Sequence, residues 1–135
     1  MRYLSRTVGL AVLAALALAL TGCFGGGSKS STPKKVRPGK PIQEISIEES
    51  EFKLDPGKVQ LGRIGIYRFH AINIGKKVHA LRIVGPGGVS ALTAKLEPGQ
   101  STTVDVFVAK KGTYRYFDPV ADHKKKGMVG LAILD

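Results

Sequence analysis

The sequence predicts an all-β domain, built as a sandwich or barrel of short strands. Three observations support this fold class. From residue 42 onward, apolar residues alternate with polar ones at a period of two, turn residues recur at short intervals, and no segment has the periodicity of a long helix. A chain of 135 residues has room for one such domain with a small core. We therefore place the folded domain at residues 42–135.

The first half of this region contains three expected strands. The segment "EISIEE" alternates Ile45 and Ile47 with polar residues, and "KVQLG" follows the turn "DPGK". In "GIYRFHAIN", Tyr67 and Phe69 occupy one face and His70 occupies the other. We therefore expect His70 to lie at the surface and to take no part in a site.

The second half continues this pattern. The segment "VHALRIVGPGG" ends in glycines, "EPGQ" is a turn, "STTVDVFVAKKG" places three valines on one face, and "TYRYFD" and "MVGLAIL" close the chain. In "TYRYFD" the side chains of Tyr114, Tyr116 and Asp118 share a face. If the tyrosines are buried, Asp118 points into the end of the sandwich, where an ionised carboxylate needs a partner. A turn at Pro119 would instead leave it at the rim.

The first 22 residues have the pattern of a secretion signal. Arg2 and Arg6 precede the apolar run "VGLAVLAALALAL", which is short for a membrane span. The run ends in "LTGC", which resembles the bacterial lipobox. This resemblance implies a lipid on Cys23 and a domain anchored to a membrane outside the cytoplasm, in the periplasm or on the outer face of the cell membrane. The alternative is an ordinary signal peptide, or a signal anchor, with an incidental cysteine.

Residues 23–41 are interpreted as the lipidated cysteine and a flexible, basic linker. The segment "FGGGSKSSTPKKVRPGK" contains five basic residues and no acidic one, so its charges are either solvated or attracted to anionic lipid headgroups. The formal charge of the whole chain is +11, and residues 41–135 contain 14 basic and 10 acidic residues. Because that excess is modest and forms no basic helix, we expect no nucleic-acid partner. Cys23 is the only cysteine, which excludes an internal disulfide.

One segment near the C-terminus combines aspartate, histidine and methionine at regular intervals. "GTYRYFDPVADHKKKGMVG" resembles the copper-ligand loop of the cupredoxins, in which a Gly-x-Tyr-x-aromatic strand leads to Cys, then His, then Met and Gly. Upstream, "NIGKKVHAL" is similar to the cupredoxin segment that supplies the first histidine. The turns "DPGKVQL" and "LEPGQS" also match, so the similarity spans residues 45–135. It implies a Greek-key β-sandwich with copper at one end.

The resemblance also implies a ligand set. The two histidines are His79 and His123, the weak axial ligand is Met128, and the cysteine position is occupied by Asp118. Asn73 is at the position of the family residue whose hydrogen bonds tie the two ligand loops together.

Aspartate in place of cysteine changes the expected chemistry. A carboxylate oxygen is a hard ligand, whereas a thiolate is soft and strongly covalent. We therefore expect the site to bind copper, as Cu(II), or alternatively Zn(II), and not to be blue. The competing interpretation is a site without metal, in which Asp118 pairs with a protonated His79 or His123. Met128 can equally be part of the core.

We accordingly predict a membrane-anchored cupredoxin-like protein that binds or handles copper at the cell envelope. The alternatives are an electron-transfer protein, which the Asp118 substitution disfavours, and a metal-free interaction module. An enzyme is not expected, since no nucleophile with a base and no phosphate loop is present. The run Lys124, Lys125 and Lys126 is either a solvated loop or a docking patch for an acidic protein partner.

Overall fold

Nine strands pack as two sheets in the part of the chain that the structure, a computed structural model, describes: residues 39–135. These strands are β1 (Gln43–Ser50), β2 (Lys53–Asp55), β3 (Lys58–Leu61), β4 (Gly65–Asn73), β5 (Arg82–Gly85), β6 (Val89–Leu92), β7 (Ser101–Val108), β8 (Gly112–Phe117) and β9 (Val129–Leu134). Two short 3-10 turns, η1 (Pro86–Gly88) and η2 (His123–Lys126), interrupt them. The all-β prediction is confirmed.

The predicted signal segment at residues 1–22, the lipidated Cys23 and most of the linker 23–41 lie outside the described residues. Between residues 39 and 135, no helix has the length and apolar character that a membrane crossing requires.

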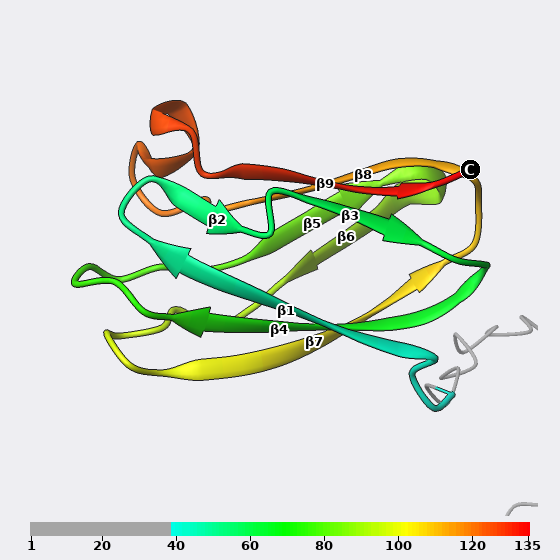
Figure 1. Cartoon of the computed structure of the whole chain (residues 1–135), viewed down its shortest axis with the longest axis horizontal. Helices are drawn as coiled ribbons and strands as arrows, with labels where there is room; N and C mark the ends of the chain where they lie inside the picture. Colours follow the sequence, from blue (N-terminus) through cyan, green and yellow to red (C-terminus); the bar gives the residue numbers. More distant parts are fainter. Residues whose placement is uncertain (1–38) are drawn as a thin grey trace, which may run out of the picture. The chain divides into compact units, whose positions relative to one another are not determined.

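The two sheets face each other across the core (Figure 1). One contains four strands in the order β2-β1-β4-β7, and the other contains five in the order β3-β9-β8-β5-β6. The pairs β1–β4 and β3–β9 are parallel, and the remaining pairs are antiparallel. Because the chain crosses between sheets several times, residues distant in sequence meet at the ends of the sandwich.

Strand alternation determines which side chains fill the core. On β4, Tyr67 and Phe69 are buried, whereas His70 lies on the outer face with its Nδ1 atom 3.5 Å from Glu44. On β8, Tyr114 and Tyr116 are buried against the other sheet. Burial of such large aromatic side chains is the main source of stability in a small sandwich.

Two contacts fix β8, the strand that leads to Asp118. The hydroxyl of Tyr114 donates a 2.8 Å hydrogen bond to the carbonyl of Lys110, which satisfies its polar end inside the core. Gly130 lies opposite Tyr116 on the paired strand β9, and a Cβ atom there would come within 2.1 Å of the tyrosine ring. The absence of a side chain at Gly130 therefore leaves the space that the Tyr116 ring occupies against β9.

Three connecting segments gather at one end of the sandwich, on the left in Figure 1. They are the turn between β1 and β2, the chain that follows β4, and the loop from β8 to β9 that contains η2. All the histidines and carboxylates considered next lie in or beside these segments.

Candidate metal centre

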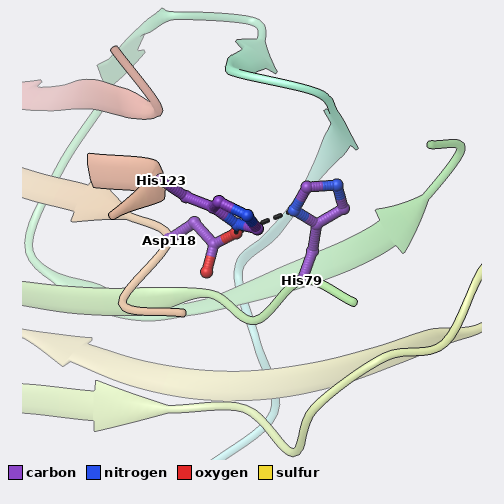
Figure 2. Close-up of side chains that lie close together, drawn as sticks. All are labelled: His79, Asp118 and His123. Carbon is purple, nitrogen blue, oxygen red and sulfur yellow. Dashed lines mark hydrogen bonds and ion pairs between the residues drawn. The ribbon is translucent and has the colours of Figure 1, made fainter. Parts of the chain in front are cut away.

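His79, Asp118 and His123 meet at this end of the sandwich, as the sequence predicted (Figure 2). Each of the three offers one potential ligand atom, and these atoms all lie within 4.8 Å of one another. All three residues are buried. The residues are 39 and 5 positions apart in sequence, so the convergence depends on the sheet topology as well as on the local loop.

Asp118 is the centre of the group. Its Oδ2 atom lies 2.7 Å from the Nδ1 atom of His79 and 2.7 Å from the Nδ1 atom of His123. Its Oδ1 atom accepts hydrogen bonds from the backbone N–H groups of Ala80, at 3.3 Å, and Val120, at 2.8 Å. The carboxylate thus has donors on both oxygens, which compensates for its complete removal from water. The side chain points inward, as the parity of β8 predicted.

His79 is held by its backbone. It forms an isolated bridge with Leu96, in which the His79 N–H donates at 3.1 Å and the Leu96 N–H donates back at 2.8 Å. The imidazole is fully buried, and within residues 39–135 its Nε2 atom has no hydrogen-bond partner. One edge of the ring therefore faces Asp118, and the nitrogen on the other edge is left without a hydrogen bond in this part of the chain.

His123 begins η2, and its ring completes the group. The ring centroid lies 5.1 Å from that of His79, and Phe52 covers it edge-on at a centroid distance of 5.8 Å. Met128 is fully buried and is connected to the loop through its backbone, since its carbonyl accepts from Asp118 N–H and its N–H donates to the His123 carbonyl. Met128 also belongs to the hydrophobic core cluster. A ligand role for its sulfur stays a prediction.

Asn73, at the end of β4, is buried and shapes the loop that carries His79. Its side-chain amide donates to the carbonyls of Lys77, at 2.7 Å, and Leu96, at 2.8 Å, and its carbonyl oxygen accepts from Gly75 N–H. Within residues 39–135, none of its side-chain hydrogen bonds reaches the loop from Asp118 to Met128. Asn73 was expected to connect the two ligand loops by hydrogen bonds. It instead connects the loop that carries His79 to the segment before β7.

Two carboxylates near the group were not predicted. Glu49 is fully buried near the end of β1, and neither of its oxygens has a hydrogen-bond partner in the described part of the chain. Burial first, and then the charge of Asp118, raises the pKa of Glu49 to about 8. Its alternation with Ile45 and Ile47 could have indicated this inward direction. Glu51, in the turn after β1, lies with Oε1 3.9 Å from the Nε2 atom of His79.

The donor set fits a transition-metal ion. Two imidazole nitrogens and one carboxylate oxygen, nearly closed to solvent, are the ligands typical of Cu(II) and Zn(II) sites. The same atoms also satisfy one another as hydrogen-bonded partners, because 2.7 Å is a normal length for a charge-assisted hydrogen bond. An ion can bind here by replacing the two Nδ1 protons.

Comparison with known proteins finds similarity in structure and not in sequence. No family model matches the chain, and no curated protein does. Auracyanin B matches with a TM-score of 0.65 and 18% identity over 73% of this chain and 93% of its own. A dithionite-reduced auracyanin from Roseiflexus castenholzii matches with a TM-score of 0.62 and 19% identity, over 72% of this chain and 99% of its own.

A third neighbour is auracyanin A, described as a "blue" copper protein from Chloroflexus aurantiacus. It matches with a TM-score of 0.61 and 16% identity, over 71% of this chain and 100% of its own. At these identities the likeness shows the fold alone. The described residues therefore form a cupredoxin-like β-sandwich, and the prediction of this fold class is confirmed.

Proposed function

We propose that this protein binds one copper ion, as Cu(II), through His79, Asp118 and His123. The observation that carries the proposal is the convergence of two buried imidazole Nδ1 atoms on one buried carboxylate oxygen, each at 2.7 Å. Burying an ionised carboxylate costs free energy unless it has partners, and a divalent cation is a partner of opposite charge that two imidazoles can bind together with Asp118. Met128 is proposed to lie nearby as a weak ligand at most.

The aspartate suggests a role in holding or passing on copper. We propose that Asp118 occupies the position where blue copper proteins have cysteine, as the resemblance of its loop to theirs suggests. A carboxylate stabilises Cu(II) against Cu(I), because hard oxygen ligands favour the higher oxidation state. Rapid electron transfer is therefore the less suitable use of this site. The same donors also accept Zn(II), which makes zinc the first competitor to test.

The setting of this activity is proposed to be the cell envelope. The support is the signal-like segment 1–22 with the lipobox-like "LTGC", which would attach Cys23 to a membrane and leave the domain outside the cytoplasm.

An acidic protein is the proposed partner. Lys124, Lys125 and Lys126 are exposed beside His123. Lys126 Nζ lies 4.6 Å from the centre of the Phe52 ring, and Lys77 Nζ, from a different loop, lies 5.5 Å from that centre. Lysines from two loops thus lie close to the Phe52 ring that covers His123. One of them, Lys126, also forms a 3.0 Å ion pair with Asp122. Such a surface would accelerate association in a salt-dependent manner.

The test is a Cu(II) titration of the full chain by calorimetry and visible absorption. The proposal expects one ion per chain and only weak visible absorption. His79→Ala and His123→Ala should each abolish this uptake, whereas His70→Ala, on the outer face, should leave it unchanged. Uptake that is the same in all four proteins would place copper elsewhere and reject the proposed site.

One substitution checks the assigned position of Asp118. Asp118→Cys should give an intense blue absorption with Cu(II), since a thiolate then joins two histidines. A correctly folded Asp118→Cys protein that binds copper without this band would show that residue 118 does not contact the ion.

A second candidate function is a metal-free interaction module. It is favoured by the same two distances, because Asp118 Oδ2 already accepts from both imidazoles at hydrogen-bond length. In that case the three residues serve as an internal brace, and the wild-type chain takes up neither Cu(II) nor Zn(II) in the titration above.

A further inference from the structure

Glu51 faces the edge of His79 that points away from Asp118. Its Oε1 atom lies 3.9 Å from the Nε2 atom of His79, which is an ion-pair distance and longer than a hydrogen bond. The Nε2 atom is fully buried and has no hydrogen-bond partner among residues 39–135. The two nitrogens of one imidazole are thus each directed at a carboxylate, Nδ1 at Asp118 and Nε2 at Glu51.

The position of Glu51 is fixed by the loop that carries His79. Its Oε1 atom accepts the backbone N–H groups of Lys76, at 2.5 Å, and Lys77, at 2.9 Å. These backbone donors are the main reason that the pKa of Glu51 is lowered, so its carboxylate is ionised at neutral pH. The carboxylate comes from the turn after β1, about 25 residues before the amides that hold it.

The chain leaves room for this approach at Gly75. A Cβ atom on Gly75 would come within 2.8 Å of Glu51 Oε1 and 3.0 Å of His79 Nε2. A side chain there would therefore intrude between the carboxylate and the imidazole. The φ angle of Gly75 is not positive, so another residue could adopt this backbone conformation. Glycine matters here because it leaves space for Glu51 and His79.

We infer that Glu51 is a positioning residue that stabilises the proton of His79 on Nε2 when a metal ion takes the place of the proton on Nδ1. This inference rests on the proposed metal site. A histidine that binds a metal through one nitrogen usually donates the N–H of the other to a carboxylate or carbonyl, which fixes the tautomer and raises the basicity of the ligand. His123 has only Asp118 as a carboxylate neighbour within ion-pair distance in the described residues, so the two histidines are held differently.

The decisive variant is Glu51→Gln, which keeps an oxygen for the Lys76 and Lys77 amides but removes the charge. Its matched control is Glu48→Gln, an exposed glutamate on β1. Zn(II), which is diamagnetic, serves as the probe for the full chain. Zinc affinity should fall by about 10- to 100-fold in Glu51→Gln and stay at the wild-type value in Glu48→Gln.

Long-range ¹H–¹⁵N spectra of the imidazole rings provide a readout that a merely structural role would not change. With zinc, the wild type should show the His79 proton on Nε2 and the metal shift on Nδ1. In Glu51→Gln, and in Gly75→Ala, the Nε2 proton should exchange rapidly with water. If both variants retain wild-type zinc affinity and a protected Nε2 proton, Glu51 does not position His79.

The two proposals fail in different ways. A wild-type chain that takes up neither Zn(II) nor Cu(II) refutes the metal site itself. If the wild type binds zinc through His79 and both Glu51→Gln and Gly75→Ala bind it equally well, only the role of Glu51 is refuted.

Discussion

Asp118 and Glu49 are both fully buried carboxyl groups, yet their surroundings differ completely. Asp118, just after β8, has two backbone N–H donors on one oxygen and two imidazoles on the other. Glu49, near the end of β1, has no hydrogen-bond partner on either oxygen among the residues that the structure describes. Burial therefore has opposite consequences for the two: Asp118 is equipped to carry a negative charge, and Glu49 is kept neutral at pH 7 by a pKa of about 8.

The contrast shows that position inside the sandwich does not determine the charge of a carboxyl group. The donors supplied by neighbouring loops determine it. The charge at Asp118 also works against ionisation of Glu49, because it is one of the two causes of the raised pKa. A positive ion beside Asp118 would remove that repulsion.

The largest effect should come from removing the carboxylate that has partners. Asp118→Ala leaves two buried imidazoles without their shared acceptor, so the free energy of unfolding in urea, measured without metal at pH 7, should fall by about 4 kcal/mol. Asp122→Ala, an exposed aspartate in the same loop, is the matched control and should stay near the wild type. A small loss in Asp118→Ala would mean that the hydrogen bonds of this group contribute little.

The next effect concerns the carboxyl group without partners. Because the folded-state pKa of Glu49 is raised from 4.5 to about 8, the unfolded chain releases this proton first as the pH rises. The contribution of Glu49 to the free energy of unfolding is therefore fully present below pH 4.5, and it is lost as the pH rises to about 8. Between pH 4.5 and 7 the metal-free wild type should lose about 3 kcal/mol of stability from this residue, at about 1.36 kcal/mol per pH unit.

Glu49→Gln should abolish this part of the pH dependence, whatever its effect on stability at one pH. Urea unfolding at several pH values between 4.5 and 8 measures the slope. Glu48→Gln, on the exposed face of the same strand, should retain the wild-type slope. If Glu49→Gln also retains it, Glu49 is ionised in the folded protein and must have a partner.

The smallest effect should be found at a carboxylate whose partner lies near solvent. Asp105 on β7 accepts two hydrogen bonds from Arg68 on β4, at 2.7 and 2.9 Å, on the outer face of the sheet. This guanidinium lowers the pKa of Asp105. The pair therefore stabilises the folded protein at neutral pH, and this stabilisation is lost as the pH falls through the lowered pKa. Arg68→Ala should lower the Tm less than either change above, and 0.5 M salt should reduce the difference further. A loss as large as that of Asp118→Ala would contradict the comparison.

The meeting of His79, Asp118 and His123 was expected from the resemblance of their two loops to those of the cupredoxins. Strand parity added the inward direction of Asp118, on the condition that Tyr114 and Tyr116 are buried, and they are. The same parity, applied to Ile45 and Ile47, would have placed Glu49 inside as well. Glu49 lies within the polar run Glu48–Glu51, so its burial was not expected. Alternation predicts the direction of a side chain, and it does not show whether hydrogen-bond donors surround that side chain.

The role of Glu51 could not have been predicted in this way. Its position depends on the backbone of the loop after β4, where two N–H groups point at its carboxylate. The same is true of Asn73, whose hydrogen bonds reach Lys77 and Leu96 and not the second ligand loop. Side-chain contacts with the backbone of a distant loop depend on the completed fold and leave no periodic pattern in the sequence.

Two imidazoles and the Asp118 carboxylate are proposed to share one ion. Pulsed electron paramagnetic resonance of the full chain with one equivalent of Cu(II) reports on this arrangement, because remote imidazole nitrogens modulate the signal and can be counted. We expect two coordinated imidazoles in the wild type and one or none in His79→Ala and in His123→Ala. A wild-type signal without two imidazoles, or one that neither substitution alters, would show that the three side chains do not share the ion.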